Sequence, residues 1–184
     1  MIIRSHDRPA TPWKNGQGRT RELATCPPGA DMDSFQWRVS VAEVDSAAPF
    51  STFPGVDRCI VLLDGAGFIM TLDDERQHAL LTPFVPFAFP GEAKVSVTLA
   101  GGATRDFNLM LRRHAVRGSV EVWRDADPHV VDATVALVYC AHGTLACAEG
   151  ELHAGDAWLP GDDRRMTWQQ GTVVLVVRVE VVGG

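Results

Sequence analysis

The stretch Leu152-His-Ala-Gly-Asp-Ala-Trp-Leu-Pro-Gly161 ends in a Pro-Gly corner and precedes the Val-rich run Val173–Val179. In the first half of the chain, Leu81-Thr-Pro-Phe-Val-Pro-Phe-Ala-Phe-Pro-Gly91 ends in the same corner and precedes Val95–Leu99. Both stretches follow apolar runs that end in a glycine turn: Cys59–Gly65 and Val135–Gly143. Self-similarity at a spacing of about 75 residues indicates duplication of one small β unit.

The rest of the chain also has the pattern of short strands. Apolar, β-branched runs are separated by turn-forming pairs such as Pro54-Gly55, Asp64-Gly65 and Gly101-Gly102. No window has a clean helical period over three turns, and no room is left for the long helices of an α/β protein. We therefore predict an all-β protein. The predicted strands are Trp37–Val44, Cys59–Leu63, Phe68–Leu72, Lys94–Leu99, Phe107–Leu111, Ser119–Trp123, Thr134–Tyr139 and Thr172–Val182.

The spacing Leu152-x-x-Gly-Asp-x-x-Leu-Pro-Gly161 resembles the corner between the two half-motifs of a cupin. This resemblance implies a bicupin, with a first cupin-like barrel and its N-terminal segment in residues 1–113 and a second barrel in residues 114–184. Bicupins resemble one another in lending an early strand to the later barrel, and Ile2–Arg4 is the candidate for that strand. The alternative is a single irregular β-sandwich with chance internal similarity.

Composition excludes several classes of function. The 184 residues include 17 Lys and Arg against 23 Asp and Glu, a formal net charge of −6, so we expect no nucleic-acid partner. The longest stretch without charged residues, Ala133–Ala148, is shorter than the ~20 residues of a spanning helix, and the N-terminus lacks a signal-peptide pattern. We therefore expect no membrane partner and a cytoplasmic location. The four cysteines form no C-x-x-C pair and are predicted to be reduced thiols.

The histidines argue against the metal site of many cupins. Metal-binding cupins resemble one another in having His-x-His, a nearby Glu and a later His. In this chain no two histidines are separated by one or three residues, so no local pair has the usual ligand spacing. We predict a barrel without a metal and without another cofactor. The histidines are His6, His78, His114, His129, His142 and His153.

Two predicted strands have polar side chains on one face. Alternation puts Arg38 and Ser40 on one face of Trp37–Val44. It likewise groups four residues of the segment around Phe107–Leu111: Asp106, Asn108, Met110 and Arg112. A cup with these side chains suits a small anionic ligand, because an arginine offers a carboxylate two parallel N–H donors. The alternative is that both faces point to water.

The segment Pro12-Trp-Lys-Asn-Gly-Gln-Gly-Arg-Thr-Arg-Glu22 concentrates functional groups around two glycines, and we interpret it as a loop that closes over the cup. A Gly-x-Gly this short is weak support for a phosphate loop. A second polar pair, Asp57-Arg58, comes just before a strongly apolar strand. An adjacent Asp-Arg pair alone is most often a surface ion pair.

Four blocks together resemble the HutD/Ves family. They are Pro12-Trp-Lys-Asn-Gly-x-Gly-x-Thr20-x-Glu22, Trp37-Arg-Val-Ser40, Pro49-Phe-Ser-x-Phe-Pro-Gly-Val-Asp-Arg58 and Asp106-Phe-Asn-x-Met-x-Arg-Arg113. The resemblance implies a bicupin fold, no established catalytic activity, and an association with histidine-utilisation genes. It also implies a role in binding a pathway intermediate such as urocanate or N-formylglutamate.

Three functions follow from these patterns. The first is a small-molecule protein that binds a carboxylate and modulates histidine utilisation. The second is a metal-independent isomerase or hydrolase, with Glu22, Asp57 or Asp106 as general base. The third is a structural or partner-binding protein whose strand Val173–Val182 pairs at the edge of a homodimer. The predicted ligand-binding residues are Trp13, Lys14, Asn15, Gly16, Thr20, Glu22, Arg38, Ser40, Asp57, Arg58, Asp106, Asn108, Met110 and Arg112.

Overall fold

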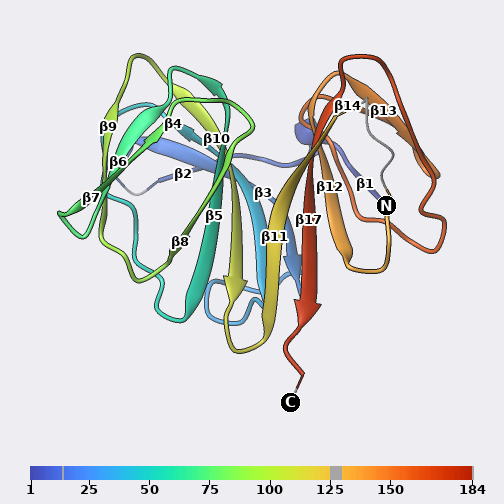
Figure 1. Ribbon diagram of the computed structural model, residues 1–184, viewed down its shortest axis with the longest axis horizontal. Coiled ribbons are helices and arrows are strands. Elements are labelled where there is room, and N and C mark those ends of the chain that lie inside the picture. Colours follow the sequence, from blue (N-terminus) through green and yellow to red (C-terminus); the bar gives the residue numbers. More distant parts are fainter. Residues whose placement is uncertain (14, 125–129, 184) are drawn as a thin grey trace. The chain divides into compact units, whose positions relative to one another are not determined.

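The computed structural model describes residues 1–13, 15–124 and 130–183, and the chain divides into two compact units (Figure 1). The first unit is Pro9–Val116, and the second combines Met1–Arg8 with Arg117–Gly184. Apart from the short 3-10 helix η1 (Ser5–Asp7), the regular elements of the described residues are all β-strands. The prediction of an all-β protein is therefore confirmed.

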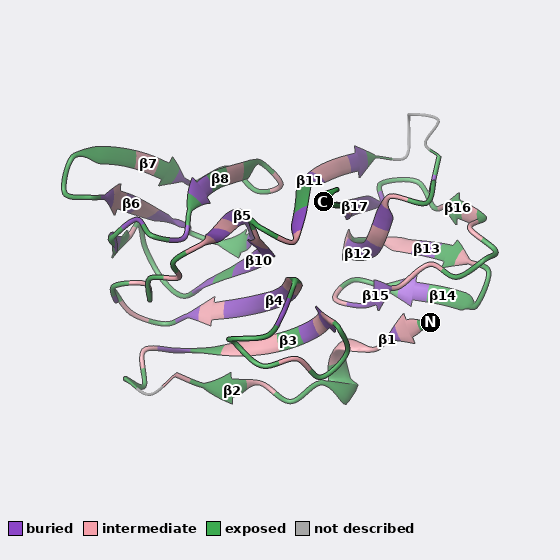
Figure 2. Ribbon diagram, turned by 90° about the horizontal axis from the view of Figure 1, so that it is seen from below, coloured by how far each residue is buried: buried purple, intermediate pink, exposed green. Residues whose placement is uncertain are grey.

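The first unit contains two antiparallel sheets. Its strands are β2 (Thr11–Pro12), β3 (Gly18–Cys26), β4 (Trp37–Val44), β5 (Val56–Gly65), β6 (Phe68–Leu72), β7 (Arg76–Leu80), β8 (Pro86–Pro90), β9 (Val95–Leu99) and β10 (Thr104–Arg112). The larger sheet has the order β2-β3-β4-β10-β5-β8, and the smaller has the order β7-β6-β9. The edge strand β2 is exposed, whereas β4 and β10 are largely buried (Figure 2).

Strand β10 aligns the polar side chains of its two neighbours. Met110 pairs with Arg38 of β4 on one side and with Arg58 of β5 on the other. Two residues earlier, Asn108 lies opposite Ser40. Because side chains alternate along a strand and directly opposed residues share a face, this register gathers the polar groups on one face of the sheet.

The same face of the larger sheet is apolar elsewhere. Ile60 and Leu62 of β5 pack in one buried cluster with Phe68, Met70 and Leu72 of β6, which belongs to the smaller sheet. Full burial of each such side chain contributes roughly 1.5–3 kcal/mol to stability. The two sheets are therefore held together by apolar packing next to the polar group of side chains.

The second unit has a larger and a smaller sheet as well. Its strands are β1 (Ile2–Ile3), β11 (Val116–Arg124), β12 (Val135–His142), β13 (Thr144–Cys147), β14 (Gly150–His153), β15 (Ala157–Trp158), β16 (Met166–Trp168) and β17 (Val173–Val181). They form a five-stranded sheet, β1-β15-β12-β17-β11, and a three-stranded sheet, β14-β13-β16. Val138, Val174 and Val176 of the former pack with Leu145 and Leu152 of the latter. The interior formed by this cluster is apolar.

The N-terminal segment is part of the second unit. Ile2 pairs with Trp158, which puts β1 at the edge of the five-stranded sheet. Just after β1 in the sequence, Nη1 of Arg4 donates to Oδ2 of Asp156 at 2.7 Å. The backbone N–H of Ser5 donates to the other oxygen of Asp156 at 3.0 Å. Residues near the start of the chain are thus tied to residues more than a hundred positions later.

Agreement between predicted and observed strands is close for the apolar runs. Trp37–Val44 and Phe68–Leu72 are strands with the predicted bounds, and the remaining predicted strands differ only at their ends. The interpretation of Trp13–Glu22 as a loop is wrong in part, because Gly18–Cys26 is strand β3. Exposed Arg19 alternates there with glycine and threonine, so the stretch lacks the apolar alternation that identifies a strand.

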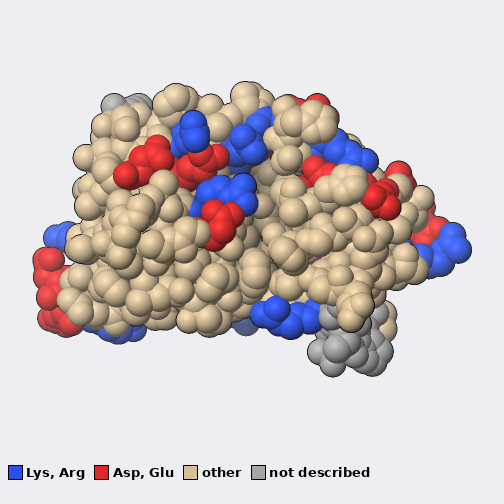
Figure 3. All heavy atoms as spheres, turned by 90° about the horizontal axis from the view of Figure 1, so that it is seen from above, with Lys and Arg blue, Asp and Glu red and all other residues tan. Residues whose placement is uncertain are grey.

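The surface has mixed charge. On the face drawn in Figure 3, basic and acidic side chains lie next to one another. In the part of the chain that the structure describes, no helix has the length and apolar character needed to cross a membrane.

Candidate ligand-binding site

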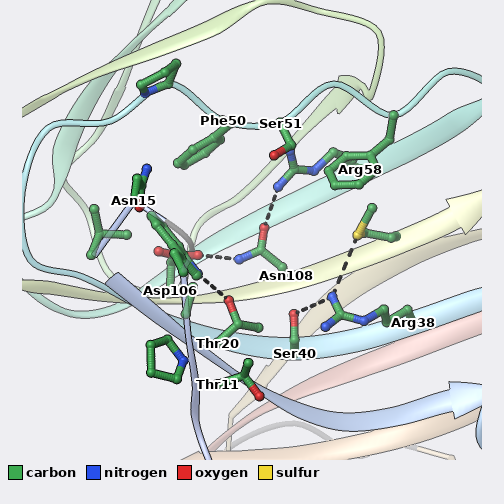
Figure 4. A pocket seen from close by; sticks show the side chains of 17 residues that line it. Thr11, Asn15, Thr20, Arg38, Ser40, Phe50, Ser51, Arg58, Asp106 and Asn108 are labelled. Atoms are coloured by element: carbon green, nitrogen blue, oxygen red, sulfur yellow. Dashed lines mark hydrogen bonds between the residues drawn. The ribbon is translucent and has the colours of Figure 1, made fainter. Parts of the chain in front are cut away.

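A cavity of about 590 Å³ lies within the first unit. Its walls come from the inner face of β3, β4, β5 and β10, from the beginning of the β2–β3 hairpin, and from the segment that precedes β5 (Figure 4). The lining residues are Thr11, Pro12, Trp13, Asn15, Thr20, Arg38, Ser40, Ala42, Val44, Pro49, Phe50, Ser51, Phe53, Arg58, Asp106, Asn108 and Met110.

Three side chains form a hydrogen-bonded row along one wall (Figure 4). Arg58 donates from Nη2 to Oδ1 of Asn108 at 3.1 Å, and Asn108 donates from Nδ2 to Oδ1 of Asp106. Each of the three residues is buried. Because the amide of Asn108 accepts on one side and donates on the other, it separates the cation from the carboxyl and contacts both.

Arg58 has an aromatic environment. Its guanidinium carbon lies 5.4 Å from the ring centre of Phe50, 5.5 Å from that of Phe53 and 4.9 Å from that of Phe89. Its Nε has no hydrogen-bond partner among the described residues. Burial lowers the pKa of Arg58 to about 10, with a raising effect from Asp106 and a further lowering from Arg38, so it stays cationic at neutral pH. Cation–π contacts with these rings stabilise the buried positive charge, but they leave the N–H group at Nε of Arg58 without an acceptor.

Asp106 is the titratable acid of the cavity wall. Burial raises its pKa to about 7, and hydrogen bonding from Asn108 and the charge of Arg58 offset that effect only in part. Its Oδ2 has no hydrogen-bond partner in the part of the chain that the structure describes. A carboxyl whose pKa lies near neutral pH in a cavity is able to donate, accept or transfer a proton.

Arg38 is the second cation of the lining, and it is bound more fully than Arg58. Its Nε donates to Oε2 of Glu22 at 2.8 Å. Its Nη1 lies 3.4 Å from Oγ of Ser40 and 4.0 Å from Sδ of Met110. An anion that enters the cavity therefore meets Arg38 already in an ion pair.

Trp13 is fixed at the hairpin between β2 and β3. Its indole N–H donates to Oγ1 of Thr20 at 2.7 Å, and its backbone N–H donates to the carbonyl of Gly18 at 2.9 Å. A Cβ on Gly18 would lie 3.0 Å from the indole and 2.5 Å from the carbonyl oxygen of Glu43, so only glycine lets the ring approach the strand this closely. Gly16 has a φ of +69°, which glycine adopts without strain.

A model of the HutD family matches residues 5–176. The chain belongs to the HutD family. An uncharacterized 21.2 kDa protein in the hutC 3′ region of Pseudomonas putida is 40% identical over 142 residues, which are 77% of this chain and 73% of that protein. Protein Ves of Citrobacter koseri is 34% identical over 164 residues, which are 89% of this chain and 80% of that protein.

A solved structure agrees with this assignment. HutD from Pseudomonas fluorescens SBW25 has a TM-score of 0.82 at 27% identity, over 100% of this chain and 99% of that one. The HutD/Ves resemblance of the sequence is therefore confirmed, and so is the prediction of a two-unit, cupin-like all-β fold.

The four blocks that resemble HutD supply most of the cavity wall. The predicted site residues that line it are Trp13, Asn15, Thr20, Arg38, Ser40, Arg58, Asp106, Asn108 and Met110. Lys14 lies outside the described residues. These residues are far apart in the sequence and meet because β10 is paired with both β4 and β5.

Four predicted site residues of this HutD-family chain do not line the cavity: Gly16, Glu22, Asp57 and Arg112. Gly16 lies in the hairpin turn, and Glu22 lies beyond Arg38, to which it is paired. Asp57 pairs with Arg113 at 2.8 Å and not with the cavity cation. Alternation explains this, because Asp57 and the lining residue Arg58 are neighbours on β5 and point to opposite faces.

Arg112 is the most instructive of these four residues. Its guanidinium donates to the carbonyls of Met32 at 2.9 Å and Asp33 at 3.2 Å, and it lies 4.8 Å from the ring centre of Phe35. It shares the alternation of Met110, but it is the last residue of β10, past the end of the cavity. Of the three candidate arginines Arg38, Arg58 and Arg112, only Arg38 and Arg58 therefore line the cavity.

Sequence reasoning missed the aromatic wall. Phe50, Ser51 and Phe53 line the cavity, although only Asp57 and Arg58 were candidates in that block. The signal was present, because all of these residues belong to the block Pro49–Arg58 that resembles the HutD family.

No group of three or more His, Cys, Asp or Glu with metal-binding geometry occurs among the described residues. That the protein binds no metal stays a prediction, and elemental analysis of the purified protein tests it.

Proposed function

We propose that this chain is a cytoplasmic small-molecule-binding protein that holds a carboxylate in the cavity of its first unit and modulates histidine utilisation. Its ligand is an intermediate such as urocanate or N-formylglutamate. Membership of the HutD family and a relative in the hutC 3′ region of Pseudomonas putida support the pathway. HutD from Pseudomonas fluorescens has been solved in a formate condition, and formate is the simplest carboxylate.

The observation that best supports a carboxylate ligand is the environment of Arg58. A buried guanidinium is costly unless its charge is balanced, and no carboxylate contacts it directly among the described residues, since Asn108 separates it from Asp106. Its Nε is unpartnered. An incoming carboxylate supplies both the missing charge and the missing acceptors in a two-pronged geometry.

The remaining walls suit the body of a small organic acid. Trp13 and Phe50 offer ring surfaces, and Asn15 and Ser51 offer hydrogen-bonding groups. A mostly apolar cavity with a few placed polar groups is typical of small-molecule sites.

Calorimetry and thermal shift with formate, glutamate, urocanate and N-formylglutamate test this proposal. For the best ligand, Arg58→Lys keeps the charge but loses the planar fork, so the binding free energy should weaken by ~1–3 kcal/mol. Arg76→Lys is the matched control on an exposed strand outside the cavity, and it should leave affinity unchanged. Equal affinities for the two variants would place the site elsewhere, and no binding of any carboxylate would refute the proposal.

A second function is favoured by one observation, the near-neutral pKa of Asp106 in the cavity. A metal-independent isomerase or hydrolase would use Asp106 as general base, since Glu22 and Asp57 lie outside the lining. Prolonged incubation of urocanate and N-formylglutamate with the protein, followed by NMR, measures turnover. Product formation that disappears in Asp106→Asn would support the enzyme, and unchanged compounds that still bind would support the binding protein.

A further inference from the structure

One oxygen of a buried carboxyl in the cavity is left without a donor. Asp106 is 1% exposed and lines the cavity, and its Oδ2 has no hydrogen-bond partner in residues 1–13, 15–124 and 130–183. Its Oδ1 already accepts from Asn108. Buried polar atoms of proteins are nearly always bonded, so an exception in a cavity indicates that a partner comes from outside the chain.

Asn108 explains why Arg58 does not supply that partner. The carbonyl oxygen of the Asn108 amide accepts from Arg58, and its nitrogen donates to Asp106. The amide thus lies between the cation and the carboxyl and keeps them from closing on each other. Arg58 keeps an unused donor at Nε, and Asp106 keeps an unused acceptor at Oδ2. The wall therefore offers two complementary positions, one for an anion and one for a hydrogen-bond donor.

We propose that Oδ2 of Asp106 accepts a hydrogen bond from an N–H group of the bound ligand, so that the cavity selects carboxylates whose body presents an N–H donor. This inference rests on the proposed function, because it requires the ligand carboxylate to lie on Arg58. It adds a residue that discriminates among carboxylates, whereas Arg58 alone would hold any of them. A site built to bond an N–H group rejects the analogue that lacks it, since its own acceptor is then left unpaired.

The charged groups around Asp106 set the pH dependence of this selection. Arg58 on β5 and Arg38 on β4 are the other charged lining residues that the structure describes, and Glu22 of β3 is paired with Arg38. Arg58 stays cationic across neutral pH. An N–H ligand stabilises ionised Asp106, so its affinity should rise as pH rises through about 7, the pKa of the carboxyl.

A carboxylate without the N–H group should behave in the opposite way. It brings a second negative charge near Asp106 and no donor, so it favours the protonated carboxyl. Its affinity should fall over the same pH range. The opposite slopes distinguish an accepting Asp106 from one that donates a proton to the ligand, for which every carboxylate would bind more tightly at low pH.

Two matched pairs of flat carboxylates test the inference by calorimetry. One pair is pyrrole-carboxylate and furan-carboxylate, and the longer pair is pyrrole-acrylate and furan-acrylate, all substituted at the ring carbon beside the heteroatom. Within a pair, a ring N–H is exchanged for a ring oxygen at nearly constant shape. At about pH 8, the pyrrole member of at least one pair should bind about tenfold more tightly. Its affinity should rise between about pH 6 and about pH 8 while that of the furan falls.

Two variants test whether the Asp106 carboxyl causes the opposite pH slopes. Asp106→Asn has no titrating group, so the affinities of pyrrole and furan members should lose their opposite pH slopes. Asp74→Asn, on an exposed turn of the same unit, is the control and should keep them. Equal affinities within both pairs, or slopes that survive in Asp106→Asn, would overturn the inference while the proposed function stands. If these four probes fail but simple carboxylates bind, the inference alone fails, and if nothing binds, both fail.

Discussion

Asp106 and Asp156 are both buried, at 1% and 4% exposure, one in each unit, and the two carboxyls differ in their partners. Asp156 accepts hydrogen bonds on both oxygens, from Arg4, from the backbone of Ser5 and from the backbone of His153. Burial alone would raise its pKa, but these donors outweigh burial and the pKa is lowered. Asp106 has one bonded oxygen, and burial raises its pKa to about 7.

The difference separates a carboxyl with donors on both oxygens from one that keeps an unpartnered oxygen. The Asp156 carboxylate fastens the N-terminal segment to a unit whose interior is filled by apolar side chains such as Leu145 and Val174. The Asp106 carboxyl faces a cavity and keeps an acceptor unused. The two units therefore differ in their interiors, since the cavity of the first contains buried polar groups that are incompletely hydrogen-bonded.

Removal of residues 1–8 should have the largest effect. The deletion removes β1, the buried side chain of Ile3 and the ion pair of Arg4 with Asp156, and it leaves a buried carboxylate without its cation. The second unit should lose about 3 kcal/mol or more of unfolding free energy. Urea unfolding measures the loss, and ligand affinity in the first unit should be kept. An unchanged unfolding midpoint would mean that β1 is dispensable.

Asp156→Asn tests the same carboxylate without removal of backbone. The variant loses the charge that Arg4 contacts, so stability near neutral pH should fall by about 1.5–3 kcal/mol. Because the folded pKa is lowered, the contribution of Asp156 is present above about pH 4 and is lost as pH falls through the folded pKa. The gap between wild type and variant should therefore narrow in acid. A difference in unfolding free energy that does not change with pH would mean that the lost stability comes from the shape of the side chain and not from its charge.

Asp106→Asn should change stability in the opposite direction. Because the folded pKa is raised, ionisation favours the unfolded state, and wild-type stability falls between about pH 4 and about pH 7. The neutral amide avoids this cost, so the variant should be more stable than wild type by about 1–2 kcal/mol at pH 8, with a smaller difference near pH 5. Thermal unfolding at the two pH values measures it. Destabilisation at pH 8 would show that ionised Asp106 is well satisfied.

The sequence predicted the fold well for a physical reason. Apolar alternation is a local property, and it located strands such as Trp37–Val44 and Phe68–Leu72 with their observed bounds. Apolar alternation failed for Gly18–Cys26. In that strand Gly18 leaves space for the ring of Trp13, and Arg19 is exposed to solvent. Strand identity in that segment depends on pairing with β4, which no local pattern contains.

The site was predicted less completely than the fold, because which residues line the cavity depends on where the strands lie relative to each other. Alternation correctly put Asn108 and Met110 on one face, but it could not say where along β10 the cavity ends. It also could not show that Asn108 separates Arg58 from Asp106, since that depends on the register of β10 with β5. The unpartnered oxygen of Asp106 is likewise a property of packing and not of sequence.

Arg112→Lys should have the smallest effect on binding and therefore tests where the cavity ends. Its guanidinium contacts the carbonyls of Met32 and Asp33 and the ring of Phe35, and it does not line the cavity. The substitution should cost ~1 kcal/mol of stability through the lost stacking and hydrogen bonds. Calorimetry should find affinity for the best carboxylate within about twofold of wild type, because distant sites contribute nearly independently. A loss as large as that of Arg58→Lys would instead move the anion site to the end of β10, next to the segment that contains Phe35.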